Sequence, residues 1–115
     1  LRQFCYSGIM SRLIDEKEKK IMQFQHVDNQ QKGVFFLNDD QSNRIAEISY
    51  VWSGEHKIIA DHTWVDDSLR GQGIARQLLD TLVDFAREKK LKIVATCSYV
   101  DVMFRREKSY ADVIA

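Results

Sequence analysis

The sequence predicts one α/β domain built on a mixed sheet, with its elements in the order β-β-β-α-β-α. Three β-rich runs come first, an apolar stripe at helical spacing follows, and a further apolar run comes after that stripe. A helix between two strands favours a right-handed crossover, so the strands that flank the long helix should be parallel. A chain of 115 residues suffices for a single hydrophobic core.

The first three runs predict an antiparallel meander. Residues 34–37 (VFFL) are β-rich and lead into the polar turn NDDQSN. Residues 44–52 alternate apolar and polar side chains, and SGEH then turns the chain into a third run at residues 57–65. His26 and His56 stand in polar stretches outside these runs, so we expect both of them at the surface.

A stripe of apolar side chains predicts the long helix. Ile74, Leu78, Leu82 and Phe85 repeat at helical spacing, and lysines gather at its end, where the helix dipole favours cations. The next run, KIVATCSYV at residues 92–100, has the composition of a buried strand.

The last segment, residues 101–115, predicts a short helix that turns Val102, Met103 and Tyr110 inward. This helix completes the expected order of elements.

The start of the chain allows two interpretations. In the first, residues 1–21 are an N-terminal extension, non-native or flexible, ahead of a domain at residues 22–115, and Met22 is the native start. The charge run DEKEKK just before that methionine favours this division. In the second, a genuine N-terminal helix runs from Phe4 to Lys20.

Charge and cysteine usage narrow the partners and the compartment. Seventeen Lys and Arg balance seventeen Asp and Glu, so no net field attracts nucleic acid or an anionic membrane, and we expect neither as a partner. Cys5 and Cys97 form no CxxC pair, which argues against a zinc site or a disulfide framework and favours a reducing, cytoplasmic setting. No apolar run reaches the roughly 20 residues of a membrane span.

Two glycines stand at the predicted strand-to-helix crossover, in the stretch SLRGQGIARQLLD. Without side chains at Gly71 and Gly73, backbone N–H groups can converge on an anion, and the helix N-terminus adds about half a positive charge. A phosphate or pyrophosphate is the ligand that this pattern favours. The alternative is a plain glycine turn that starts a helix.

Two nucleotide motifs fail at this loop. A P-loop needs Lys-Ser/Thr after its second glycine, and Ile74-Ala75 stands there instead. A dinucleotide fingerprint needs a third small residue where Arg76 stands, and an acidic residue about 20 positions further on, where VATCS offers none.

The loop does fit the pattern Arg/Gln-x-x-Gly-x-Gly/Ala, through Arg70, Gly73 and Ala75. This resembles the acyl-coenzyme A signature of the GNAT-type N-acetyltransferases. The resemblance extends to AEISYVW, to IIADHTWVDDSLRGQGIARQLLDTLVDFAREKKLKIVATCSYV and to SYADV, which together cover most of residues 33–113 in the family's order. The chain looks like a member of the short, single-domain bacterial subgroup of that superfamily.

The resemblance implies a minimal GNAT-like fold with splayed parallel strands around acetyl-coenzyme A, which serves as co-substrate without a metal. The strand at Thr63–Val65 would part from its neighbour at Ala95–Ser98, with pantetheine in the gap and pyrophosphate on the glycine loop. Backbone N–H groups at Trp64 and Val65 would polarise the thioester carbonyl. The expected cofactor-binding residues are Trp64, Val65, Arg70, Gly71, Gln72, Gly73, Ile74, Ala75, Arg76, Ser98 and Phe104.

His62 and Cys97 are the candidate catalytic residues. A lysine-like amine, with a pKa of about 10.4, must lose a proton before it attacks, and an imidazole with an ordinary pKa of about 6.5 suits that task. His62 lies in the strand that would flank the cofactor and matches the subgroup's HT pair, although a hydrogen-bonded structural histidine fits as well. Cys97 could serve in the site as a proton donor, as a cofactor-lining group or as an acyl-accepting nucleophile. The alternative is a small core residue without a role in the site.

Two departures from the larger GNAT enzymes bear on activity. Phe104 stands where their tyrosine protonates the leaving thiolate, so Cys97, Tyr99, Tyr110 or water does this, or the acid is dispensable. Only NDDQSN stands where they insert a helical pair, so the acceptor cleft should be open and suited to a protein, peptide or small-molecule amine. We expect an N-acetyltransferase that works by direct transfer in a ternary complex, or alternatively a coenzyme A-binding module with little catalysis.

Overall fold

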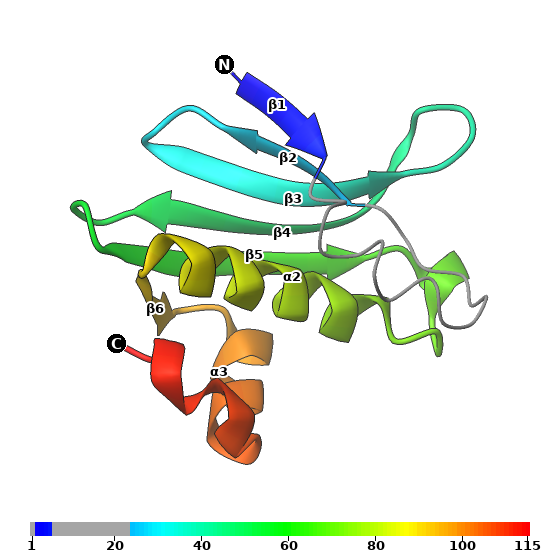
Figure 1. The fold of residues 1–115 in the computed structure, drawn as a ribbon. Helices are drawn as coiled ribbons and strands as arrows, with labels where there is room; N and C mark the ends of the chain where they lie inside the picture. Colours follow the sequence, from blue (N-terminus) through cyan, green and yellow to red (C-terminus); the bar gives the residue numbers. More distant parts are fainter. Residues whose placement is uncertain (1, 6–23) are drawn as a thin grey trace.

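Six strands form one sheet in which each strand neighbours the next along the chain (Figure 1). The structure is a computed structural model that describes residues 2–5 and 24–115. The strands are β1 (Arg2–Cys5), β2 (Gln25–Asp28), β3 (Lys32–Asn38), β4 (Arg44–Trp52), β5 (Lys57–Val65) and β6 (Lys92–Ala95). The helices are α2 (Ile74–Lys89) and α3 (Ser98–Arg106), with the 3-10 helices η1 (Asp67–Leu69) and η2 (Lys108–Val113).

Strands β1 to β5 pair antiparallel, whereas β5 and β6 are parallel and joined through α2. The predicted meander is confirmed as β3, β4 and β5, and the predicted crossover is confirmed as α2 between β5 and β6. The expected order is therefore extended by two strands at the start of the chain. Of the proposed helix from Phe4 to Lys20, the first two residues belong to β1 and the rest lies outside the described residues, as does Met22.

Strand β2 corrects the expectation for His26. The sequence predicts this histidine on the surface, but it is 1% exposed and its Nε2 lies 2.7 Å from the Tyr50 hydroxyl. Its ring stacks on Phe35 at 4.0 Å between centroids, and Phe85 contacts it edge-on. Burial disfavours the charged imidazole, which lowers the pKa of His26 from 6.5 to about 4. His56 is on the surface, as predicted.

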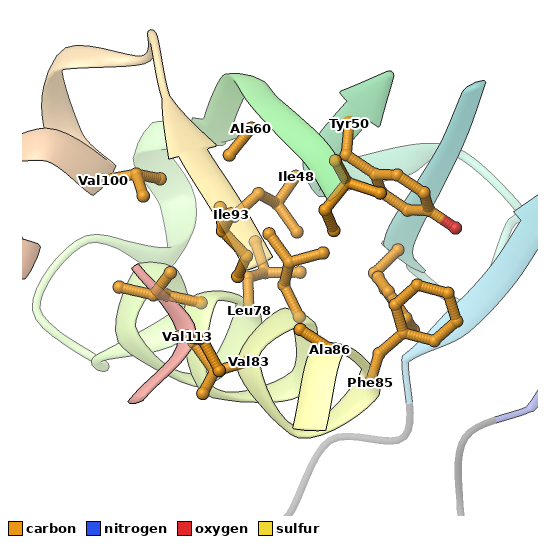
Figure 2. Close-up of a cluster of buried hydrophobic side chains, with 14 of the residues drawn as sticks. Ile48, Tyr50, Ala60, Leu78, Val83, Phe85, Ala86, Ile93, Val100 and Val113 are labelled. Carbon is orange, nitrogen blue, oxygen red and sulfur yellow. The ribbon is translucent and has the colours of Figure 1, made fainter. Parts of the chain in front are cut away.

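Helix α2 covers one face of the sheet and closes the core against it (Figure 1). Its apolar stripe meets the inward side chains of β4 and β5, because side chains alternate between the two faces of a strand. Figure 2 shows the core residues Ile48, Tyr50, Ala60, Leu78, Val83, Phe85, Ala86, Ile93, Val100 and Val113. We call the sheet face away from α2 the distal face.

The chain after α2 differs from the prediction in two respects. Strand β6 ends at Ala95 rather than running through TCSYV, because Cys97 is the N-cap of α3. A short apolar run does not distinguish a strand from the start of a helix. Val102 is 46% exposed and so does not face inward, whereas Met103 and Tyr110 are buried as expected.

The described part of the chain contains two α-helices, and neither has the length and apolar character that a membrane-spanning helix needs.

Candidate functional site

Two glycines with left-handed backbones shape the connection between β5 and α2. Gly71 has a φ of 84°, and Gly73 has a φ of 72°. A Cβ atom at either position would meet no heavy atom within 4 Å, so conformation rather than space requires glycine there. These glycines lie at the strand-to-helix crossover, where an α/β sheet commonly binds its ligand.

The first turn of α2 carries backbone N–H groups without helical partners. The first bond of the helix runs from the Gln77 N–H to the Gly73 carbonyl at 3.1 Å, and Gly73 provides no side-chain cap. The N–H groups of Ile74, Ala75 and Arg76 precede that bond. The Gln72 N–H already donates to the Leu69 carbonyl at 3.2 Å. The groups that can bind an anion here are therefore the N–H groups of the first turn of the helix rather than that of Gln72.

Arg70 and Arg76 flank this turn. The Arg70 guanidinium lies 2.8 Å from Asp67, with both side chains more than three-quarters exposed. Arg76 lies 3.7 Å from Asp80 and 3.9 Å from Glu107, at the edge of the ion-pair range. Exposed pairs of this kind contribute only about 0.2 to 1 kcal/mol, so either guanidinium can move to a phosphate at small cost.

The parallel ladder between β5 and β6 ends at the Ala60–Ala95 pair. The Ala60 carbonyl then accepts from the N–H groups of both Thr96 and Cys97 at 3.0 Å, as the chain turns away into α3. β5 continues beside β4 as far as Val65. The two parallel strands therefore part after Ala60, as predicted, but residues 96–98 lead into α3 and do not continue β6 as the expected second strand of the splay.

The backbone of β5 beyond the ladder faces two directions. The Asp66 N–H donates to the Ile45 carbonyl at 2.8 Å, on the β4 side. By the alternation of an antiparallel pair, the N–H of Trp64 also faces β4, whereas those of Thr63 and Val65 face the gap. Of the two residues expected to donate, Val65 thus has its N–H directed away from β4, whereas Trp64 does not, and Thr63 shares the direction of Val65.

Cys97 and Thr63 meet across the gap. The half-buried Cys97 Sγ lies 3.4 Å from the Thr63 Oγ1, which joins the start of α3 to the free part of β5. Ser98, the first residue of α3, is exposed beside it. The thiol therefore lies beside the part of β5 that extends beyond its last pairing with β6.

Other expected site residues are buried. Ile74 is 2% exposed and Phe104 is 8% exposed, and both belong to the hydrophobic core. Phe104 packs beside Tyr110, with ring centroids 5.6 Å apart. Ile74 can therefore contact a ligand through its backbone, and Phe104 supports α3 from within the core.

Burial makes both tyrosines that were considered as proton donors, Tyr99 and Tyr110, weaker acids. The Tyr110 hydroxyl donates to Asp80 Oδ1 at 2.6 Å. Burial, reinforced by the neighbouring Asp80 carboxylate, raises the pKa of Tyr110, and burial also raises the pKa of Tyr99. Since a phenol with a raised pKa is a weaker acid, these groups favour a donor other than tyrosine.

His62 lies on the distal face, next to a β-bulge. Ser49 pairs with His62 and Tyr50 pairs with Ala60, so Asp61 is an extra residue in β5. The bulge leaves both Asp61 and His62 exposed. The Ser49 hydroxyl donates to Asp61 Oδ1 at 2.8 Å.

Glu47 contacts His62 from the neighbouring strand. The Glu47 Oε2 lies 3.3 Å from His62 Nε2, with the histidine side chain 54% exposed. Glu47, together with Val34, Ser49 and Asp61, also lines a cavity of about 330 Å³, whose lining does not include His62. The sequence prediction missed Glu47, Asp61 and Thr63, although the alternation in RIAEISYVW does place Glu47 and Ser49 on one face.

Among residues 2–5 and 24–115, no group of three or more His, Cys, Asp or Glu side chains gathers as a metal site requires.

Comparison with known proteins identifies a family model and proteins that are similar in sequence to this chain. The family model for GCN5-related N-acetyl-transferases matches residues 34–113. The protein NATD1 of Xenopus tropicalis is 38% identical over 55 residues, which are 48% of this chain and 50% of that protein. NATD1 of Danio rerio is 30% identical over 92 residues, which are 80% of this chain and 74% of that protein. The chain thus spans about half the length of the first of these relatives.

Solved structures share the fold. The solution structure of a GCN5-like protein from Staphylococcus aureus superposes with a TM-score of 0.63 at 41% identity, over 78% of this chain and 86% of that one. A ribosomal-protein-alanine N-acetyltransferase from Brucella melitensis gives a TM-score of 0.50 at 26% identity, over 59% of this chain and 51% of that one.

Proposed function

This chain belongs to the GCN5-related N-acetyltransferase family, and from that premise we propose that it transfers an acetyl group from acetyl-coenzyme A to an amine in a ternary complex. The observation that carries the proposal is one juxtaposition. The left-handed glycines and the first turn of α2 follow, along the chain, the part of β5 that extends beyond its last pairing with β6. In this proposal the turn would hold the pyrophosphate, and the part of β5 beyond β6 would lie along the pantetheine.

The pyrophosphate would lie on the N–H groups of Ile74, Ala75 and Arg76. The helix dipole stabilises its charge there, and the side chains of Arg70 and Arg76 can add to it. Support for this assignment comes from the two glycines, since the left-handed backbone that forms the turn is one that residues with a Cβ adopt at a cost.

The thioester would lie in the gap between β5 and β6. The Thr63 and Val65 N–H groups would donate to its carbonyl oxygen and stabilise the negative charge that develops as the amine attacks. Cys97 would lie close to the sulfur, since its thiol reaches the Thr63 hydroxyl across the gap.

The acceptor would approach from the distal face, through the cavity beside Glu47. His62 takes one proton from the ammonium group, and the neutral nitrogen then attacks the carbonyl carbon. A C–N bond forms, the C–S bond breaks, and the nitrogen releases its second proton. Coenzyme A leaves as a thiolate that takes a proton from the Cys97 thiol or from water. The products are the N-acetyl amine, coenzyme A and one proton.

A coenzyme A-binding module is the second candidate. Two observations favour it: Phe104 stands where larger GNAT enzymes carry an acidic tyrosine, and the Tyr110 hydroxyl is engaged by Asp80. Such a module would bind acetyl-coenzyme A through the same cradle and would release thiol no faster than the uncatalysed reaction.

Thiol release from acetyl-coenzyme A, measured with a panel of small amines and lysine peptides, separates the two functions. We expect amine-dependent release that falls roughly 100-fold or more in His62→Ala, because a positioned general base contributes about 10²- to 10⁴-fold. His56→Ala is the matched control, since this histidine is on an exposed turn. Equal rates in wild type and His62→Ala would remove the base assignment.

A further inference from the structure

Three side chains on the distal face form a continuous chain of contacts that ends at His62. The Arg44 Nη1 lies 3.0 Å from Glu47 Oε1, and the other carboxylate oxygen, Oε2, lies 3.3 Å from His62 Nε2. The Arg44 guanidinium stacks over the Phe36 ring at 4.0 Å. Each oxygen of the Glu47 carboxylate therefore has its own cationic or polar neighbour.

This arrangement restrains Glu47 more than an ordinary surface carboxylate. Its side chain is 23% exposed, and Phe36, on which Arg44 rests, is 5% exposed. Glu55 and His56 provide the contrast within the same chain. Their groups lie 3.9 Å apart, with both side chains at least 81% exposed. The strand register makes Glu47 and His62 diagonal neighbours on one face of the sheet, because Ser49 is opposite His62 and Glu47 is two residues from Ser49.

We infer that Glu47 is a positioning residue that keeps the proton of neutral His62 on Nε2 and leaves Nδ1 to take the proton from the acceptor amine. The inference rests on the proposed function, since it assigns His62 its reacting nitrogen. A histidine with a carboxylate on one ring nitrogen is fixed in tautomer and orientation, and the second nitrogen is then the base. Arg44 keeps the carboxylate from turning away.

Glu47 also stabilises the product of the proton transfer. When Nδ1 accepts a proton, the ring becomes an imidazolium, and the carboxylate on Nε2 offsets its charge. Asp61 and Ser49 flank His62 in the two strands but are hydrogen-bonded to each other, whereas the Glu47 carboxylate contacts the imidazole itself.

Ring nitrogen chemical shifts, measured by NMR without any ligand, test the positioning. His56 serves as the internal reference for a ring that solvent averages between tautomers. In the wild type we expect His62 to show a single tautomer, with Nδ1 unprotonated. In Glu47→Ala its shifts should approach those of His56, whereas Glu47→Gln, which keeps an acceptor oxygen, should retain the wild-type pattern. Glu55→Gln is the matched control and should leave His62 unchanged.

Turnover with the best amine of the panel tests the consequence. We expect kcat to fall roughly 10- to 100-fold in Glu47→Ala, less in Glu47→Gln, with the KM for acetyl-coenzyme A unchanged. Wild-type shifts for His62 equal to those of His56, or a Glu47→Ala enzyme with wild-type kcat, overturn the inference while the proposed function stands. Lack of turnover in the wild type with every amine overturns the proposed function and with it the catalytic meaning of the pair.

Discussion

Replacing Gly33 with alanine tests how tightly β3 packs against the Tyr50 side chain of β4. A Cβ at this position would lie 2.3 Å from the Tyr50 hydroxyl oxygen and 2.4 Å from its Cζ. Tyr50 is fully buried, and its hydroxyl donates to Asp28 and lies 2.7 Å from His26 Nε2. The ring therefore moves only if these contacts break.

The expected loss in the free energy of unfolding is about 3 kcal/mol. Overpacking a core costs roughly 1 to 3 kcal/mol, and each displaced hydrogen bond costs about 1 kcal/mol more. For 115 residues that loss lowers the melting temperature by roughly 12 °C, since the entropy of unfolding is about 2.1 cal/mol/K per residue. Denaturation followed by circular dichroism measures it.

Gly54→Ala is the control for this prediction. Gly54 has a φ of 89°, and a Cβ added there would meet no heavy atom within 4 Å, so alanine costs only the left-handed backbone, about 1 kcal/mol. A melting temperature of Gly33→Ala equal to or higher than that of Gly54→Ala would refute the close approach of Gly33 to Tyr50.

Further predictions concern the buried histidine, the end of the chain and the thiol. Because the pKa of His26 is lowered from 6.5 to about 4, its contribution to stability is complete above pH 6.5 and is lost as the pH falls through 4, a loss of about 3 kcal/mol. Urea titrations between these pH values should show this slope in the wild type and not in His26→Phe, and equal slopes would contradict the buried neutral imidazole. Asp112→Asn removes the two-point pair with Arg87, at 2.9 Å for both contacts. Since both side chains are partly exposed, we expect a small loss of stability that shrinks at high salt, and a loss independent of salt would argue against an electrostatic origin. Incubation with acetyl-coenzyme A in the absence of amine should leave the intact mass unchanged, whereas an acetyl group on Cys97 would replace direct transfer by a two-step mechanism.

Local patterns predicted the elements whose burial follows from their own sequence. The stripe through Ile74, Leu78 and Leu82 matches the buried face of α2, and the alternation in residues 44–52 matches the two faces of β4. Strand β2 has no such pattern, because QHVD has little apolar character. His26 is buried through a partner 24 residues away, and no local rule reports such a pairing.

The candidate site divides in the same way. The glycine turn was visible in sequence because glycine, unlike residues with a Cβ, adopts the backbone of positions 71 and 73 without strain. The pairing of Glu47 with His62 was not visible, because it depends on strand register and on the bulge at Asp61. The end of β6 at Ala95 was not visible either. The apolar run at residues 92–100 suits a strand and the start of a helix equally, and the chain changes from one to the other at Cys97.

Calorimetric titration with acetyl-coenzyme A, carried out on the wild type and on Gly73→Glu, tests the cradle on which the proposed function depends. A glutamate at this position strains the left-handed backbone and brings a negative charge to the start of α2. We predict saturable binding by the wild type, no comparable binding of ATP, and at least a tenfold loss of acetyl-coenzyme A affinity in a variant that remains folded by circular dichroism. Equal affinity in the two proteins, or a wild type that binds ATP in preference to acetyl-coenzyme A, would contradict the assignment of the glycine turn to coenzyme A.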